Sequence, residues 1–227
     1  MPVPHDRRGA RIGELVTEIL GSRDENLDDE SVFQLSGKLA LRIEDRMGLY
    51  PEIRTRTDLT EERSGRTFTV YSRTAARDLL TYGIAMTGVN ACPCAQDTII
   101  ERMRASGIPP APGSGIITHN QRVRVKVLIT SRNVPKLSEV VQPVSGIIHG
   151  PLSSVISPDA EADLLTEIHS DPLFVEDIVR RIAMSISEID SLNNDDRIIV
   201  KCRSMESIHP HDLLAEIDSE LGKLRKH

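Results

Sequence analysis

Aromatic side chains are scarce in this sequence, and tryptophan is missing altogether. Only 3% of the 227 residues are aromatic, so the chain lacks the stacking platforms on which proteins bind single-stranded nucleic acid. The formal net charge of −6 also argues against a general polyanion binder. Nucleic acid is therefore not an expected partner. Arginine nevertheless far outnumbers lysine, and because a guanidinium can chelate phosphate oxygens, a local phosphate site is compatible with the acidic total.

Cysteine is also sparse, and long apolar runs are missing. The three cysteines, two of them one residue apart, do not make a disulfide framework, which favours a reducing compartment. Residues 1–11 are polar and lack the apolar region of a signal peptide, and no segment approaches the ~18 apolar residues that span a bilayer. We therefore predict a cytoplasmic protein without membrane contact.

What is present is the composition of an ordinary folded protein. With 39% hydrophobic and 27% charged residues in 25.2 kDa, the chain can bury a substantial core. Strand-like and helix-like segments follow one another without a regular β-α-β alternation. This order predicts the α+β class with an antiparallel sheet.

Apolar spacing predicts the individual elements. A recurrence every three or four residues indicates helices at 12–20, 31–47 (ended by Gly48), 96–105, 135–148 (interrupted near Pro143), 160–169, 172–189 and 211–224. Alternating or continuous apolar residues indicate strands at 51–62, 66–73, 79–89, 123–129 and 197–205.

The densest chemistry begins at Cys92 and Cys94, which follow the apolar run 79–89. A Cys-x-Cys pair is too close for the Cys-x-x-Cys spacing of a zinc knuckle. We therefore expect one sulfur to be a ligand and the other to support or replace it. Two purely structural thiols are the alternative.

Two further clusters carry ligand-type side chains. His119 follows a Gly/Pro loop and opens a strand, although a lone histidine there is often only a surface residue. Glu206, His209 and His211 lie on one short segment that a proline stiffens. Thiolate, imidazole and carboxylate together are the ligand set of a catalytic divalent metal, and Fe(II), Zn(II) and Mn(II) suit it about equally.

Other polar residues are expected to have structural roles. Asp212 is placed to cap the 211–224 helix, and Cys202 shares the apolar face of its strand. His149 and His169 have no evident partners and are expected on the surface. Glu176 would by default be a solvated residue in the first turn of its helix.

At these clusters the sequence resembles the GTP cyclohydrolases of the IB and archaeal IV types. The resemblance covers nearly the whole chain from Val3 onward, and its first two motifs look closer to the archaeal branch. Four ordered motifs carry it: Ala91-Cys-Pro-Cys-Ala-Gln96, Thr118-His-Asn-Gln-Arg122, Phe174-Val-Glu-Asp177 and Glu206-Ser-Ile-His-Pro-His-Asp212.

The resemblance implies a tunnelling fold, in which antiparallel sheets carry helices on one face. It implies one cyclohydrolase domain over residues 1–227, built of two modules at about 1–133 and 134–227. It also implies a homotetramer with active sites at subunit interfaces. Family members usually carry several dozen residues, including a strand, before the segment that begins at Val3. Either this chain is a naturally short member or an upstream start is missing, and a sheet edge can be exposed as a result.

The resemblance further implies a metal site. Cys92 and His119 match metal ligands of the family, with Cys94 as an alternative ligand, and a glutamate before Phe174 completes the set. Glu161 is the expected glutamate. Glu167 is the alternative, because the segment departs from the family's usual Arg-Pro-Asp-Glu.

Substrate and acid–base roles follow from the same resemblance. Glu176 matches the glutamate that binds the amino and ring N–H edge of the purine, and Gln121 and Arg122 are further expected substrate contacts. Glu206, His209 and His211 match active-site residues in acid–base or ligand roles.

The implied activity is hydrolysis of GTP. A divalent metal, with Fe(2+) favoured and Zn(2+) or Mn(2+) as alternatives, lowers the pKa of a bound water from 15.7 towards ~7. Hydroxide would then attack C8 of the guanine ring while His209 or His211 transfers protons. Formate would leave, and a 7,8-dihydroneopterin phosphate would remain for pterin biosynthesis of the tetrahydromethanopterin or folate type. In the archaeal type this product is the 2′,3′-cyclic phosphate.

Two alternatives belong to other functional classes. A thiol-dependent reductase on the same fold would use Cys92 or Cys94 as a nucleophile towards a deazaguanine nitrile and need no metal. It would leave the motifs around His119 and His209 unexplained. A non-catalytic zinc-binding module is disfavoured because structural zinc sites are usually closed Cys/His tetrads.

Overall fold

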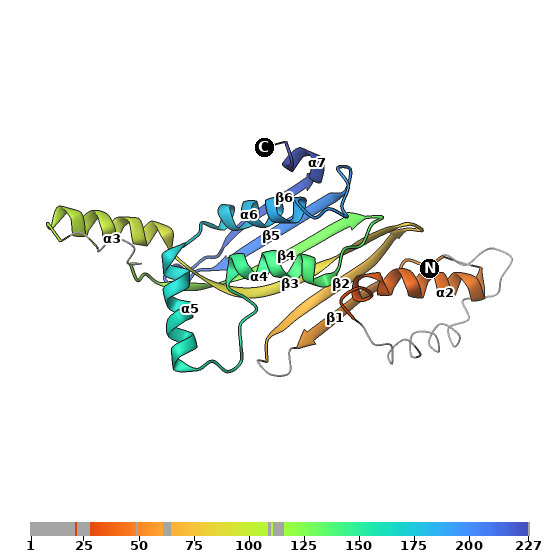
Figure 1. Cartoon of the computed structure of the whole chain (residues 1–227), viewed down its shortest axis with the longest axis horizontal. Coiled ribbons are helices and arrows are strands. Elements are labelled where there is room, and N and C mark those ends of the chain that lie inside the picture. The colour runs from red at the N-terminus through yellow and green to blue at the C-terminus, as the bar shows by residue number, and fades with distance from the viewer. Residues whose placement is uncertain are drawn as a thin grey trace.

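Six antiparallel strands form one sheet in the computed structural model, which describes residues 21, 28–48, 50–60, 65–108, 110 and 116–226. Each strand pairs with the next one in the chain (Figure 1), in the order β1 (Arg54–Thr60), β2 (Thr67–Ala76), β3 (Leu79–Ala91), β4 (Asn120–Ser131), β5 (Arg197–Met205) and β6 (Leu213–Glu220). The predicted α+β class with an antiparallel sheet is confirmed. The helix expected at residues 12–20 lies outside the described residues.

Three helices cover one face of this sheet. They are α2 (Leu35–Met47, after the 3-10 turn η2, Val32–Gln34), α4 (Leu137–Ile148) and α6 (Val175–Ser187). Figure 1 shows α3 (Pro93–Ala105) projecting beyond the sheet and α5 (Pro158–Ser170) standing beside the end where β4 begins. A single turn, α7 (Leu221–Leu224), follows β6.

The core lies between the sheet and these helices. On β4, Val123, Val125 and Val127 are fully buried on the helix side, whereas Arg122 and Arg124, which alternate with them, are exposed on the other side. We call this second side the open face; it carries Arg122, Arg124, Lys126 and Leu128 of β4 and the residues level with them on the other strands. The alternation follows from the two-residue period of a strand.

Helix boundaries follow the local sequence. Gly48 ends α2 as predicted, with a left-handed φ of 66° that glycine adopts without steric cost. Helix α4 runs unbroken through Pro143, so the expected interruption there is wrong. Val140, Val144 and Ile148 of α4 are fully buried against the sheet, and this packing outweighs a helix-interior proline cost of about 3 kcal/mol.

The helix expected at 211–224 is also wrong, because most of this segment is strand β6. Its burial alternates with a period of two, and the edge of β5 supplies backbone partners from Leu213 to Glu220. The apolar spacing of this segment fits both a helix and a strand. The segment forms a strand because the neighbouring strand β5 provides hydrogen bonds.

The sheet continues across the expected module boundary at 133/134, since β4 pairs with β5 over nine residue pairs. Within the part of the chain that the structure describes, no helix is both long and apolar enough to cross a membrane.

Candidate functional site

Cys92 and His119 lie side by side at one end of the sheet. Ala91, the last residue of β3, pairs with Asn120, the first residue of β4. One residue beyond this pair, the Cys92 N–H donates to the His119 carbonyl oxygen at 3.2 Å. Antiparallel pairing therefore brings together the two residues predicted as metal ligands.

Cys92 is also the N-cap of α3. Its Sγ accepts a hydrogen bond from the Ala95 N–H at 3.5 Å, and Pro93 occupies the first helical position, where proline is favoured. Cys92 is partly buried and Cys94 is exposed, and both are free thiols. Cys202 is fully buried, as predicted, and burial raises the pKa of its thiol to about 12.

His119 has one engaged and one unengaged ring nitrogen. Its Nδ1 lies 2.9 Å from the Ser207 hydroxyl. Its Nε2 is buried and has no hydrogen-bond partner among the described residues. Such orphaned buried atoms are rare and call for a specific cause. A histidine whose Nδ1 is held by a neighbour and whose Nε2 is free has the arrangement of a metal ligand.

The segment after β5 brings the motif that begins at Glu206 to the same place. The Ser204 hydroxyl donates to Glu206 Oε1 at 2.8 Å. The rings of His209 and His211 stack with centroids 5.5 Å apart and planes 21° from parallel. These contacts fix the side chains of this segment, although it forms no helix.

Asp212 does not cap a helix, contrary to the prediction. Its carboxylate accepts hydrogen bonds from the guanidinium of Arg203 on β5, with Nε at 2.6 Å. It follows that Asp212 is engaged by Arg203 and is not a dedicated partner of His211.

These motifs enclose a cavity of about 190 Å³ on the helix side of the sheet end. Asn90 anchors one wall, because its amide donates to the Leu173 carbonyl at 2.6 Å and accepts from the Leu173 N–H at 3.2 Å. The motif residues that line the cavity are Cys92, Pro93, Cys94, Gln121, Phe174, Val175, Glu206, His209 and His211. All four motifs therefore meet here.

Gln121 and Arg122, both expected to contact substrate, lie on opposite faces of β4. Gln121 lines the cavity, and its buried Oε1 lacks a partner among the described residues, so it can accept a hydrogen bond from a ligand. Arg122 is exposed on the open face.

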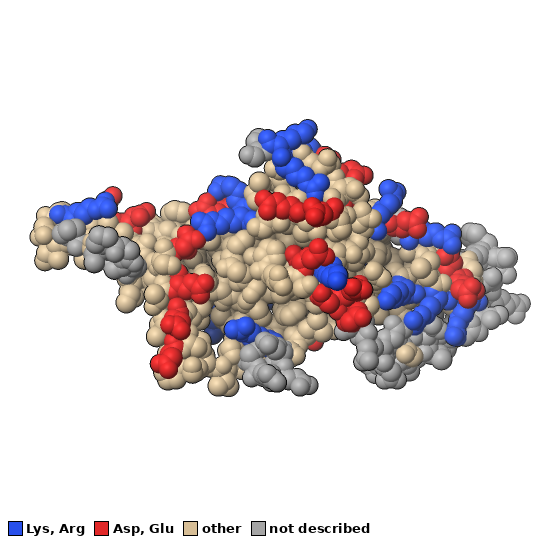
Figure 2. Space-filling view, in the orientation of Figure 1, with Lys and Arg blue, Asp and Glu red and all other residues tan. Residues whose placement is uncertain are grey.

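The expected glutamates lie outside the cavity. Glu161 is exposed in the first turn of α5, along which Figure 2 shows a row of acidic side chains. Glu176 is exposed in the first turn of α6, beside the cavity residue Val175. Among the described residues, no three His, Cys, Asp or Glu side chains are close enough to hold one metal ion.

Two histidines expected on the surface are in fact engaged, so that prediction is wrong. His169 is only 4% exposed; its Nδ1 lies 2.6 Å from the Leu165 carbonyl and its Nε2 lies 3.2 Å from the Thr118 carbonyl. The side chain of His149 is 13% exposed and lies 3.5 Å from the Glu167 carboxylate.

Gln96 was likewise missed as a structural residue. Its amide nitrogen donates to the carbonyls of Ile116, at 3.0 Å, and His169, at 2.8 Å. Gln96 and His169 together hold residues 116–118 in place directly before His119. Only the position of Gln96 inside a motif pointed to a role.

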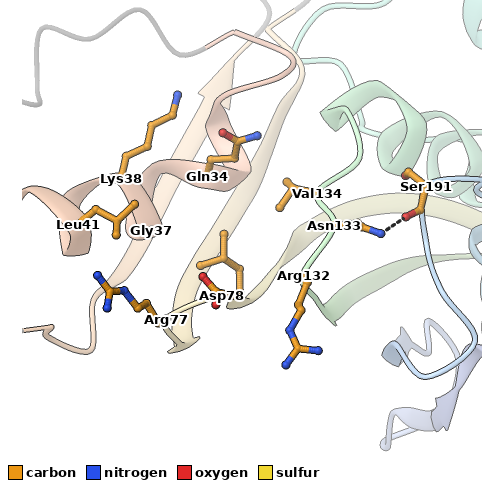
Figure 3. Close-up of a pocket in the computed structure, with 11 residues that line it drawn as sticks. Gln34, Gly37, Lys38, Leu41, Arg77, Asp78, Arg132, Asn133, Val134 and Ser191 are labelled. Atoms are coloured by element: carbon orange, nitrogen blue, oxygen red, sulfur yellow. Dashed lines mark hydrogen bonds between the residues drawn. The ribbon is translucent and has the colours of Figure 1, made fainter.

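A larger cavity of about 590 Å³ lies at the other end of the sheet, between α2 and the loop after β4. It contains no cysteine or histidine. Figure 3 shows the charged ends of Lys38, Arg77 and Arg132 pointing in different directions, and Arg77 pairs with Glu44 outside the cavity. The ligand-type chemistry is therefore at the Cys92 end.

Comparison with known proteins agrees with this geometry. The profile of the family described as type I GTP cyclohydrolase folE2 matches residues 2–215. The chain is similar to proteins named GTP cyclohydrolase MptA from Thermoplasma volcanium (35% identity over 150 residues, 63% of this chain and 52% of that protein), Thermoplasma acidophilum (37% over 153 residues, 63% and 52%) and Methanocaldococcus jannaschii (28% over 158 residues, 63% and 50%).

The chain spans about half the length of these curated relatives. The family profile, in contrast, extends over most of the chain, from the second residue into β6. On that match, this chain belongs to the family of type I GTP cyclohydrolases described as folE2.

Proposed function

We propose that the protein is a metal-dependent GTP cyclohydrolase that opens the guanine ring of GTP at C8, releases formate and leaves a 7,8-dihydroneopterin phosphate for pterin biosynthesis. The observation that carries the proposal is His119 beside Cys92, with a buried Nε2 that has no hydrogen-bond partner among the described residues. The names of the relatives, GTP cyclohydrolase MptA, support GTP as the substrate. By analogy with the archaeal branch, the proposed product is the 2′,3′-cyclic phosphate.

The donor set fits a divalent metal. Cys92 and His119 would hold it, and Glu161, with Glu167 as the alternative, would complete the set from α5. When bound, such a metal supplies a hydroxide nucleophile at neutral pH. Fe(2+) is proposed first, and Zn(2+) and Mn(2+) suit the same thiolate, imidazole and carboxylate donors.

The chain's own residues then manage the protons. His209 and His211 line the cavity as a stacked pair, so either imidazole can protonate N7 of guanine as C8 is attacked. Glu206, held by Ser204, can accept the proton of the attacking water or orient one of these rings. Gln121 Oε1 is a further acceptor for substrate N–H groups.

Base recognition is proposed to come from Glu176. Its carboxylate is exposed at the first turn of α6, where it can accept the guanine N1–H and amino protons of a nucleotide bound at a neighbouring subunit. The cavity of one subunit, about 190 Å³, is smaller than the ~300–1,000 Å³ of ordinary ligand sites, which favours a site that two subunits complete.

We therefore also propose the assembly expected of the tunnelling fold, with two modules per chain and four chains around a common tunnel. Helix α3 supports an interface, because none of its thirteen residues is buried. An isolated helix of this length is only marginally stable in water. The cytoplasmic location expected from the cysteines stays a prediction.

Metal analysis and product analysis of anaerobically purified protein test this function together. Formate and a dihydropterin phosphate, identified by mass spectrometry after incubation with GTP, are expected only from metal-loaded protein. Cys92→Ser and His119→Ala should lose bound metal and turnover while keeping the circular dichroism spectrum of the wild type. A metal-replete, active Cys92→Ser protein would refute the ligand assignment and transfer it to Cys94. Metal-free protein that reduces a nitrile would establish the reductase alternative.

A further inference from the structure

The open face of the sheet carries a row of cations along its central strand. Arg122, Arg124 and Lys126 occupy alternate positions of β4, so all three side chains leave the sheet on the side away from α4 and α6. Arg124 and Lys126 pair in register with Arg203 and Lys201 of β5. Like charges directly opposite one another on neighbouring strands are destabilising.

The strand on the other side offers no compensation. The partners of Arg122, Arg124 and Lys126 on β3 are Val89, Thr87 and Ala85, none of which is charged. Among the described residues, the row therefore has no carboxylate opposite it on either neighbouring strand.

Other cations of the same face are neutralised. Lys201 pairs with Glu216 at 2.8 Å, Arg203 with Asp212 at 2.5 Å and Arg197 with Asp218 at 2.5 Å. Towards the opposite edge, Arg54 and Arg73 share the carboxylate of Glu52. The pairing of these peripheral cations makes the central row an exception.

Within the described part of the chain, the guanidiniums of Arg122 and Arg124 have no hydrogen-bond or ion-pair partner. Lys126 lies over the ring of Tyr71, 4.3 Å from its centroid. Partial burial and the nearby charges of Lys201 and Arg124 lower the pKa of Lys126. The fold thus holds positive charge in the middle of the sheet at a cost in stability.

We propose that this cation row, Arg122, Arg124 and Lys126, binds a small anion that carries a chain of phosphate groups. Side chains two residues apart on one strand face are about 7 Å apart, so the row extends over roughly 14 Å. Guanidiniums bind phosphate oxygens in bidentate fashion. One phosphate chain can contact several members of the row at once and so reduce the repulsion between them. A single small anion contacts fewer of these side chains and reduces the repulsion less.

This site is distinct from the cavity at Cys92. The cavity lies on the helix side of the sheet end, whereas Arg124 and Lys126 point from the open face. Arg122, which the resemblance made an expected substrate contact, also leaves the sheet on the open face, so the proposal assigns it to a second anion site and does not depend on the cyclohydrolase activity.

Thermal unfolding of the full-length, metal-loaded protein with inorganic tripolyphosphate tests the proposal. Ionic strength is held constant with sodium chloride, and metal content is measured before and after. At about 100 times Kd, the anion should raise Tm by about 5–10 °C. The double variant Arg124→Thr/Lys126→Thr should lose this shift and, without the anion, should melt at or above the wild-type temperature. Threonine is chosen because it is favoured in strands. If the double variant does not fold, the single variant Arg124→Thr replaces it in the same measurement.

Arg197→Thr is the matched control, because it removes a cation of the same face that is already paired with Asp218; it should keep the full shift. An absent shift, an equal shift with sodium sulfate, or an equal shift in the double variant would each overturn the proposal. The same Tm measurement with GTP and with guanosine, which lacks phosphates, shows whether the phosphate chain of a nucleotide binds to the row. If the KM for GTP rises in the double variant, the row is a part of the substrate site and the separate site is refuted; unchanged KM and kcat support it.

Discussion

At the scale of single side chains, polar residues outside the cavity lining hold the site in place. His169 is buried with a carbonyl oxygen at each ring nitrogen, and Gln96 spans two further carbonyls. Both act on residues 116–118 and so fix the point at which His119 leaves the loop. They are positioning residues rather than catalytic ones.

His169→Leu removes a buried imidazole that lies between two carbonyl oxygens, to one of which a neutral ring can donate a hydrogen bond. Because a buried polar group left unpaired costs about 1–3 kcal/mol, we expect the free energy of unfolding to fall by about that amount in urea titrations. Metal affinity should weaken as well, since the loop before His119 loses its support. Metal retention on dialysis separates this loss from simple destabilisation.

His149→Asn is the matched control for this change. It also removes an imidazole, but one whose side chain, among the described residues, forms a partly exposed ion pair with Glu167 and no hydrogen bond. Asparagine tolerates the left-handed φ of 47° at this position. A change below about 1 kcal/mol is expected. Equal losses in the two variants would contradict the role given to His169.

Proton transfer is a second property of single residues. His209→Asn should keep metal and GTP binding and lose about 10²- to 10⁴-fold in kcat, with one limb of the pH profile flattened. Asp212 adjoins His211 in the sequence, but its carboxylate is held by Arg203 and does not set His211 apart from His209. His211→Asn must therefore be measured beside it, and the larger loss in kcat identifies the acid–base. A metal-free His209→Asn protein would make His209 a ligand instead.

At the scale of elements, the contact between β3 and α4 is closer than a side chain allows. A Cβ atom added to Gly88 would lie 1.9 Å from the Ile148 carbonyl oxygen. The strand therefore passes directly beneath the end of the helix, and only glycine permits this spacing.

Gly88→Ala should displace α4 and destabilise the protein by about 1–3 kcal/mol, the usual cost of overpacking. Gly146→Ala, in α4 itself, introduces a Cβ with nothing within 4 Å and should stabilise the helix by up to ~1 kcal/mol. In thermal or urea unfolding, the two variants are expected to change the free energy of unfolding in opposite directions. A neutral Gly88→Ala would show that the helix can move away freely.

The elements also show what the sequence allows one to predict. Strands β3 and β4 and the end of α2 at Gly48 follow from local patterns, since burial and glycine geometry act within a few residues. Strand β6 was missed because its residues fit both a helical and a strand period, and only the edge of β5 decides between them. The burial of His169 and the pairing of Asp212 with Arg203 likewise depend on partners distant in sequence or on a turn that the pattern did not reveal.

At the scale of the whole molecule, one chain supplies an incomplete site. Cys92 and His119 meet, as the motifs predicted, but the glutamates expected to join them are exposed elsewhere. In the assembly that we propose, the packing of the chains decides which carboxylate completes the set, and no sequence pattern encodes that geometry directly.

Assembly is testable through α3, whose partly buried Ile99, Ile100 and Met103 are spaced as one helix face. Ile100→Glu should prevent association and lower specific activity, because a charge buried in an apolar interface is costly. Light scattering after size exclusion gives the mass, and circular dichroism checks the fold. Glu101→Gln, at an exposed neighbouring position, should change neither. A fully active monomeric Ile100→Glu protein would contradict the shared site.

The sequential pairing of the strands also bears on how the chain emerges from the ribosome. Strands β1 to β4 can form a meander as soon as they are synthesised, because each partner directly precedes the next. Strand β4 then waits for β5 until about 65 further residues (132–196) have been made. During that interval one edge of a twelve-residue strand that contains three valines, a leucine and an isoleucine is unprotected. The nascent protein is most prone to aggregate in this window, and the three cations of β4 act as its gatekeepers until β5 arrives.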